Sequence, residues 1–305
     1  MIQHLEIKRF AKSLLIIAAG ILLSDFVIGS GLKYLYKKQK SGLLYRTSYS
    51  IDSTRADYIV LGSSRANHDY DPKVFENILK SSFYNCGRDK QGLVYSCAVL
   101  SAILERYQPK CVIIDIRPDE FTQSDEGSLA TLLPYQKNPA IRPYLDYNGK
   151  FESVKLLSHI YPYNSLFTNL IVGLKKNWKE DYKGYRALTN LNPDPALDTL
   201  KENTSVDTIK VKVFQATLTR LNQLQIPTYL VISPIHYVYI SKYTIDICLK
   251  NAGEFSNIKF LNFTNKAEWR DNSNFSDHNH LNQKGASLFS ASLAGEIQKS
   301  LNELL

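Results

Sequence analysis

The chain has 305 residues, and 37 Lys plus Arg against 29 Asp plus Glu give it a net charge of +8. Its 44% hydrophobic and 22% charged residues are ordinary globular values, which excludes wholesale disorder. Four cysteines without a Cys-x-x-Cys motif are too few for a disulfide scaffold and argue against a zinc ribbon. The positive charge suits an anionic surface, but no basic block stands out, so we expect no nucleic-acid partner.

Residues 13–32 predict a membrane-spanning helix. Asp25 is their only charged residue, and they would span roughly 30 Å, the thickness of a bilayer core. A charge within a span is costly, so Asp25 indicates a contact with another helix or a position near the interface. The alternatives are a buried soluble helix and a cleaved signal peptide, although no A-x-A-like pattern follows the apolar run. Basic residues flank the segment on both sides, so the charge rule does not decide its orientation.

The sequence divides into three parts. Residues 1–32 are predicted to form the anchor, and residues 33–54, which are polar and rich in Tyr, Lys and Ser, are predicted to form a stalk. Residues 55–305 are predicted to form one α/β domain. An insertion of short helices and loops at about 120–200 is expected to form a cap, because this region is rich in proline and tyrosine.

The α/β domain alternates predicted strands and helices. Short apolar segments predict five strands, at residues 56–64, 82–87, 111–116, 227–233 and 258–263. Helical patterns follow at residues 72–80, 93–107, 208–224, 243–251 and 282–304. This alternation predicts a parallel five-stranded sheet, in the order 2-1-3-4-5, with helices on both faces. All strands then end at one edge of the sheet, where ligands bind in such folds.

Two motifs fall at this edge. The turn Gly62-Ser63-Ser64 ends the first strand, and a glycine followed by serine there allows a tight turn that exposes a hydroxyl. The second motif, Asp-x-x-His-Leu-Asn-x-x-Gly, begins at Asp277 and precedes the last helix. Asp277 can accept the Nδ1 proton of His280, which leaves Nε2 free as a base. A serine needs such a base, because its hydroxyl is a poor nucleophile at pH 7.

Plainer interpretations remain open for the same residues. Ser63 and Ser64 could cap the next helix, and His280 could bond to backbone at a helix N-terminus. Arg65 could bind an anionic substrate group or simply pair with a carboxylate. A metal is a further alternative, with a ligand set drawn from Asp277, His278, His280, His68, Asp69 and Asp71.

The motifs, in their order along the chain, resemble those of the SGNH (GDSL-type) hydrolase superfamily, which is built on a flavodoxin-like three-layer sheet. The resemblance implies that Ser64 is the nucleophile and that Asp277 with His280 completes a catalytic triad. It also implies that Gly87, after the second strand, supplies a backbone N–H to the oxyanion hole.

The sequence departs from that family in two places. Ser63 stands where the family usually has Asp, and the Gly-x-Asn-Asp motif after the third strand is missing. The Asn of that motif is an oxyanion donor, and losing one such donor typically costs about 10²–10³ in rate. Asn85 or Arg117 could take its place, and we expect Arg65 and Arg117 to contact substrate.

Membrane-anchored members of the family act on envelope polymers, so the resemblance implies a bacterial envelope protein with its domain outside the cytoplasm, in the periplasm. It predicts a serine esterase or O-acyltransferase for acyl groups of envelope carbohydrate, with neither cofactor nor metal. The alternative is a non-catalytic SGNH-fold binding or assembly protein, which the missing Asn favours and the Asp-x-x-His ending opposes. A nucleotide or phosphate binder that uses the turn at residues 62–65 is a third hypothesis, in which His280 has no role.

Overall fold

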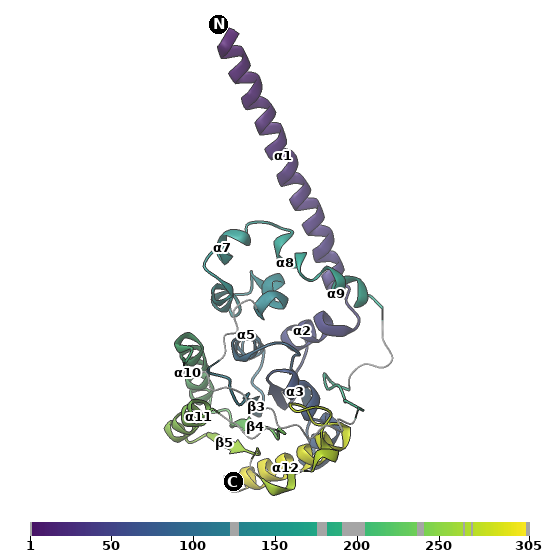
Figure 1. Cartoon of the computed structure of the whole chain (residues 1–305), viewed down its shortest axis with the longest axis vertical. Helices are drawn as coiled ribbons and strands as arrows, with labels where there is room; N and C mark the ends of the chain where they lie inside the picture. Colours follow the sequence, from purple (N-terminus) through teal and green to yellow (C-terminus); the bar gives the residue numbers. More distant parts are fainter. Residues whose placement is uncertain are drawn as a thin grey trace.

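A computed structural model provides the structure of the chain. The residues that it describes are 2–122, 128–175, 182–190, 205–236, 241–264, 266–269 and 271–302. Figure 1 shows a long helix, α1, that projects from an α/β domain, with the two ends of the chain at opposite ends of the molecule.

The centre of the domain is a parallel sheet of five strands in the order β2-β1-β3-β4-β5, as predicted. Each strand falls within its predicted segment. Every residue of the first four strands is buried, as expected for parallel strands that are covered on both faces. The strands are β1 (Tyr58–Leu61), β2 (Phe83–Asn85), β3 (Cys111–Asp115), β4 (Thr228–Ile232) and β5 (Ile258–Asn262).

Two hydrophobic cores lie on the two faces of the sheet. Successive residues of a strand face opposite sides of the sheet. Ile59 of β1 lies beside the residue that precedes Ile113 in β3, so Ile59 and Ile113 face opposite sides and belong to different cores. The first core takes in α2 (Gly42–Asp52), α5 (Leu93–Leu104), α10 (Thr208–Gln223) and α11 (Lys242–Glu254), and the second takes in α3 (Ser64–Asp69), α4 (Pro72–Leu79) and α12 (Gln283–Asn302). Figure 1 shows α5 and α12 on opposite sides of the strands.

The long helices follow from ordinary sequence signals. In α10, Asp207 caps the N-terminus by accepting the N–H groups of Ile209 and Lys210, at 3.1 and 2.9 Å. Its buried residues include Phe214 and Leu218, which are one turn apart on one face. By contrast, α5 is buried at every residue, because it lies between the sheet and the inserted segment.

The predicted insertion is a series of short helices within residues 128–175. They are η1 (Ser128–Tyr135), α6 (Arg142–Leu145), η2 (Asp146–Asn148), α7 (Glu152–Lys155), α8 (Tyr161–Asn164) and α9 (Phe167–Val172). Figure 1 shows that α7, α8 and α9 lie at the end of the domain from which α1 projects.

The N-terminal helix α1 (Ile2–Lys37) confirms the long apolar helix expected there. Residues Glu6–Lys37 are long and apolar enough to cross a membrane, with a mean hydropathy of 2.1 and only 6% of the most apolar stretch buried. That low burial does not fit the core helix of a soluble protein.

The prediction of a stalk at residues 33–54 is wrong. The last residues of α1 and the whole of α2 pack on the domain, where Tyr36, Leu44 and Ile51 are buried. The segment looked polar because its apolar residues are spaced along one face of a helix, and that face lies against α5 and α9.

Candidate active site

The turn after β1 positions Ser64. Gly62 has φ +150°, and a Cβ there would lie 2.9 Å from the Cβ atoms of Ala66 and Asp115, so a larger residue would be strained. Ser63 caps α3, because its hydroxyl accepts the N–H of Arg65 at 3.4 Å. Ser64 is the first residue of that helix. The cap interpretation therefore holds for Ser63, whereas the hydroxyl of Ser64 has a different partner.

That partner is His280. Nε2 of His280 lies 2.7 Å from Oγ of Ser64, and Nδ1 lies 2.8 Å from both carboxylate oxygens of Asp277. If Nδ1 carries the ring proton and gives it to Asp277, Nε2 can accept the hydroxyl proton of Ser64. The three residues predicted from the sequence therefore meet, in the order that a serine nucleophile requires.

The loop before α12 places His280. Asp277 Oδ1 accepts the N–H groups of Asn279 and His280, at 2.8 and 3.0 Å, which closes a single turn. The side chain of Asn282 holds the loop by donating to the carbonyls of Ser273 and Phe275. A Cβ on Gly285 would lie 2.1 Å from the carbonyl oxygen of Asn274, so the helix can approach the loop only with glycine there. These contacts explain the whole Asp-x-x-His-Leu-Asn-x-x-Gly motif.

The carboxylate of Asp277 is held in its ionised form. Burial acts to raise its pKa, but the hydrogen bond and charge of His280, with the N–H groups of Asn279 and His280, outweigh burial and lower the pKa below its usual value. An ionised Asp277 can stabilise the imidazolium that forms when His280 takes a proton.

Arg65 does not contact solvent, so the prediction that it binds substrate is wrong. Its side chain is 3% exposed and its Nε lies 3.7 Å from Asp115 and 3.1 Å from the hydroxyl of Ser233. That hydroxyl donates to Asp69 at 3.3 Å, and Tyr70 donates to Asp115 at 2.8 Å. We call Arg65, Asp69, Tyr70, Asp115 and Ser233 the buried network.

Two buried carboxyl groups share Arg65 in this network. Burial raises the pKa of Asp115, and raises that of Asp69 well above its usual value, although the charge of Arg65 acts in the opposite direction on both. Asp69 Oδ1 also accepts the N–H of Leu281, at 3.0 Å. The buried network therefore joins α3 to the residue that follows His280.

The predicted oxyanion donors are already engaged with each other. The N–H of Gly87 donates to Asn85 Oδ1 at 2.9 Å, and Asn85 Nδ2 donates to the carbonyls of Ala66 and Tyr70, at 2.7 and 3.0 Å. Asn85 is buried and ties β2 to α3, so the prediction that it binds an oxyanion is wrong. A substrate oxygen could use the N–H of Gly87 only by replacing Asn85. Gly87 is also needed for close packing, since a Cβ there would lie 2.4 Å from the backbone nitrogen of Asn67.

Arg117 follows β3 and belongs to an ion-paired cluster; its side chain is 28% exposed, and its contact with substrate stays a prediction. Its Nε lies 3.1 Å from Glu120, and Lys210 Nζ lies 3.3 Å from the same carboxyl group. Burial acts to raise the pKa of Glu120, but the charges of Arg117 and Lys210 lower it overall. Arg117 thus neutralises a buried carboxylate.

The sequence analysis named His68 only as an alternative metal ligand, whereas in the structure it is a neighbour of the triad. Its ring packs edge-on against His280, with centroids 5.4 Å apart and planes at 86°. Its Nδ1 lies 2.6 Å from the carbonyl oxygen of Arg186, and its Nε2 lies 3.2 Å from Asp89. Burial opposes ionisation of Asp89, but His68 lowers its pKa. The four-residue spacing from Ser64, which places both side chains on one face of α3, was the available signal.

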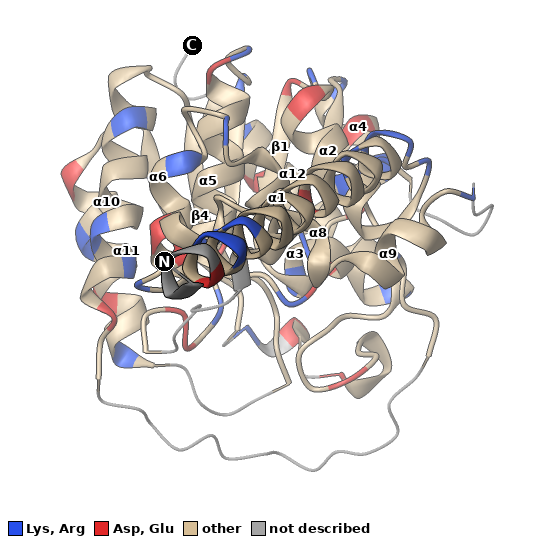
Figure 2. Cartoon of the chain, turned by 90° about the horizontal axis from the view of Figure 1, so that it is seen from above, with Lys and Arg blue, Asp and Glu red and all other residues tan. Residues whose placement is uncertain are grey.

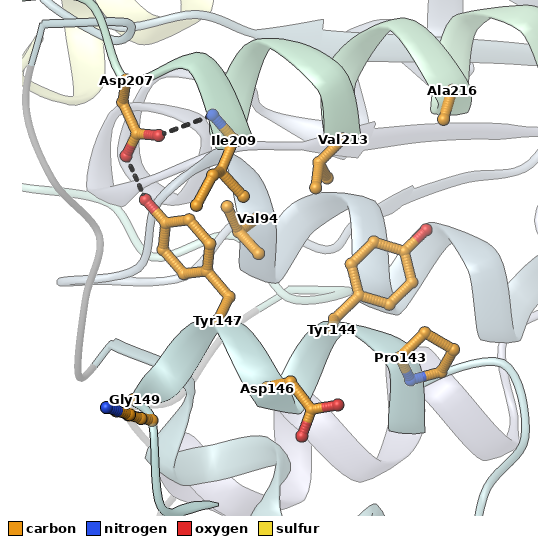
Figure 3. A pocket seen from close by; sticks show the side chains of 11 residues that line it. Val94, Pro143, Tyr144, Asp146, Tyr147, Gly149, Asp207, Ile209, Val213 and Ala216 are labelled. Carbon is orange, nitrogen blue, oxygen red and sulfur yellow. Dashed lines mark hydrogen bonds between the residues drawn. The ribbon is translucent and has the colours of Figure 1, made fainter.

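The triad does not line the pocket shown in Figure 3, which has a volume of about 670 Å³ and lies between α5, α10 and the α6–η2 segment. There Tyr147 donates to Asp207, whose other oxygen accepts the N–H of Ile209. Its walls are mainly apolar.

The alternative metal set is not assembled in the described part of the chain. No group of three or more His, Cys, Asp or Glu side chains lies there in a position to hold a metal ion. Within that set, Asp69 lies in the buried network, and Asp71 caps α4 by accepting the N–H of Lys73 at 2.9 Å.

No family model and no curated protein matches the chain. Among solved structures, it is similar to one from Streptococcus pneumonia that bears the provisional name platelet activating factor, with 10% identity and a TM-score of 0.44. The match covers 93% of this chain and 97% of the other. A likeness at that level assigns neither a fold family nor an activity.

Proposed function

We propose that the chain is a membrane-anchored serine esterase or O-acyltransferase that acts on acyl groups of cell-envelope carbohydrate. The observation that carries the proposal is the chain of contacts from Asp277 through His280 to Ser64, at 2.8 and 2.7 Å. The strand order, with the positions of these residues after β1 and before α12, supports a flavodoxin-like fold of the SGNH type.

In the first step of the proposed reaction, Ser64 Oγ attacks the carbonyl carbon of an ester while His280 Nε2 takes the hydroxyl proton. Asp277 keeps the Nδ1 proton in place and stabilises the imidazolium. The bond between the carbonyl carbon and the alcohol oxygen then breaks, and His280 gives its proton to the leaving alcohol. The acyl group remains on Ser64.

In the second step, an acceptor hydroxyl attacks the acyl carbon. His280 removes the acceptor's proton and passes it to Ser64 Oγ as the acyl–serine bond breaks. Water as the acceptor gives hydrolysis, whereas a sugar hydroxyl gives acyl transfer.

The oxyanion would form beside two candidate backbone donors, the N–H groups of Ser64 and Gly87. The start of α3 supplies the backbone N–H of Ser64, which is next to the reacting hydroxyl in the chain. The N–H of Gly87 would have to leave Asn85, with which it forms a 2.9 Å bond. Losing one oxyanion donor typically costs about 10²–10³ in rate, so we expect slow turnover of small esters.

The helix α1 supports the assignment to a membrane and an envelope substrate. Its length and apolar surface suit a single span, and a short connection at residues 38–41 joins it to a helix that packs on the domain. We place the domain outside the cytoplasm, in the periplasm, where acylated carbohydrate polymers are accessible to an anchored enzyme.

One observation favours a second function. Because Asn85 occupies the N–H of Gly87 and the Gly-x-Asn-Asp motif is missing, a non-catalytic SGNH-fold protein that binds or assembles envelope polymers would have the same structure.

A fluorophosphonate probe separates the two functions, since only an activated serine displaces its fluoride. The full-length protein in detergent should be labelled at Ser64, the Ser64→Ala variant should not, and Ser63→Ala should still be labelled. Hydrolysis of p-nitrophenyl acetate should follow the same pattern. Wild-type protein that neither takes up the probe nor turns over the ester would support the binding protein and contradict the esterase.

A further inference from the structure

The inserted segment holds α1 at a point within its apolar run. Asp25 accepts hydrogen bonds from the Ser158 hydroxyl and from the N–H groups of His159 and Ile160, at 2.5, 2.7 and 3.2 Å. One turn further along α1, a Cβ on Gly29 would lie 2.4 Å from the carbonyl carbon of His159. The small glycine lets the loop lie directly against the helix, so the domain is fixed to α1.

The position of this contact along α1 gives its depth. If Lys12 marks one edge of the hydrocarbon layer, about 20 residues bring the other edge to residue 32. Asp25 comes seven residues before that point, which corresponds to roughly 10 Å inside the layer. Exposed aliphatic side chains on α1 continue to Ile28, Leu32 is buried in the domain, and Tyr34 beyond it is 61% exposed. With α1 placed in this way, residues 158–160 lie at the level of the lipids, where the charge of Asp25 needs the hydrogen bonds that it has.

The surface around that contact is apolar. Six large side chains of α7, of the residues on either side of α7 and of α9 are each more than half exposed to solvent, and we call them the collar. Soluble proteins rarely expose so many large apolar groups together. The collar consists of Phe151 at 65% exposure, Val154 at 64%, Leu157 at 79%, Phe167 at 55%, Ile171 at 53% and Val172 at 67%.

The charges near the collar are positive. Lys150, Lys155 and Lys175 are exposed, and Lys155 pairs at 3.5 Å with Glu152, the single acidic residue between 150 and 175, which is buried. Figure 1 shows that α8 and α9 lie at the base of α1 and that α7 lies at the same end of the domain, and Figure 2 views this end from the side of the N-terminus. Apolar side chains with interspersed lysines are typical of a surface that enters the headgroup layer of an anionic membrane.

We propose that the collar is a second membrane-binding surface, which inserts beside α1 into a bilayer that contains anionic lipid. This inference depends on the proposed anchoring by α1 but not on the chemistry of Ser64. The collar and the Asp25 contact together hold the domain in one orientation on the lipid surface. The candidate active site is then kept at a constant distance from the lipid surface, and an acyl substrate must reach it at that distance.

Nitroxide labels on full-length protein in phosphatidylcholine–phosphatidylglycerol nanodiscs test the proposal. The described native cysteines are all buried, so introduced cysteines can be labelled selectively. Leu157→Cys and Ile171→Cys report on the collar. Ile16→Cys reports on the anchor, and Leu288→Cys, an apolar residue on α12 that is 48% exposed, is the matched control. For each nitroxide label, the rate of collision with oxygen, which dissolves in lipid, is compared with the rate of collision with a water-soluble nickel chelate.

We expect collisions with oxygen to dominate for the labels at residues 16, 157 and 171, and collisions with the nickel chelate to dominate for the label at residue 288. Collar labels that behave like residue 288, while residue 16 stays in lipid, would overturn the collar and leave the anchor intact. A water-exposed label at residue 16 would overturn both. Collar labels shielded from both reagents, with dipolar coupling between copies, would show that a second chain covers this face and would also overturn the proposal. Fluorophosphonate labelling of the same samples tests Ser64 separately.

Discussion

Two polar clusters lie at the carboxyl ends of the strands, and they begin at neighbouring residues. Ser64 faces His280 and Asp277, whose side chains are 19% and 48% exposed. Arg65 faces Asp115, and these two side chains are 3% and 0% exposed. Successive residues of a helix point about 100° apart, so one turn supplies both a hydroxyl that meets solvent and a cation that does not. Exposure, which the sequence does not reveal, separates the reactive cluster from the structural one.

The two clusters also treat their carboxyl groups in opposite ways. Burial acts to raise the pKa of Asp277, but its bonds to His280 and to two backbone N–H groups lower it overall. Burial raises the pKa of Asp69 and of Asp115, and Arg65 offsets only part of that effect. The surroundings of Asp277 thus favour its ionised form, whereas burial in the network favours the protonated forms of Asp69 and Asp115.

The largest effect should come from Asp277→Asn. An amide cannot hold His280 in the required tautomer, so kcat for p-nitrophenyl acetate should fall by about 10³–10⁴ while the protein stays folded. Asp271→Asn is the matched control in the same loop, because its side chain only caps η4 (Asn272–Asn274). Equal activity in the two variants would rule out a triad.

The second largest effect is on stability. Arg65→Met leaves Asp69 and Asp115 without their cation, and breaking a buried pair in this way costs about 3–5 kcal/mol of unfolding free energy. Arg220→Met removes a surface pair with Glu105 and should cost less than about 1 kcal/mol. Urea unfolding of both variants measures the difference. An Arg65→Met protein that is stable but has a raised KM would restore the substrate-binding interpretation.

Lowering the pH should change the stability contributed by the two clusters in opposite directions. This change should be smaller than the effects of Asp277→Asn and Arg65→Met. The lowered pKa of Asp277 means that its carboxylate contributes stability above about pH 4, which is lost as the pH falls. The raised pKa of Asp69 means that the folded state keeps a proton that the unfolded chain releases, so the corresponding stability is lost as the pH rises above about 4.

This contrast is measurable by urea unfolding between about pH 5 and pH 3. The stability advantage of wild type over Asp277→Asn should shrink on acidification, whereas its advantage over Asp69→Asn should grow. The same sign for both variants would contradict the assignment of the two carboxyl groups to different environments.

The smallest effect should come from Ser63→Ala. It removes the cap of α3 and should cost about 1 kcal/mol of unfolding free energy, with most of the ester hydrolysis kept. A loss of activity as large as that of Ser64→Ala would mean that Ser63, not Ser64, is the reactive serine.

Several site residues predicted from the sequence were right in position but wrong in role. Asn85 and Gly87 do lie beside α3, yet they bond to each other and to its backbone. Arg65 does follow a strand, yet its side chain is buried beside Asp115. Hydrogen-bond partners from distant segments decided these roles, and no local pattern in the sequence identifies them.

The sequence by itself determined the strands, the long helices, their order and the apolar helix at the N-terminus, because hydrophobic periodicity and capping act over a few residues. It also determined that Asp277 and His280 could pair within one turn. Only the tertiary structure decided that Ser64 meets His280 while Arg65 is buried, that residues 33–54 pack on the domain, and that Asp25 is bound by the insertion. Each of these depends on contacts between segments far apart in the chain, whose energies are set by burial and by available partners rather than by local spacing.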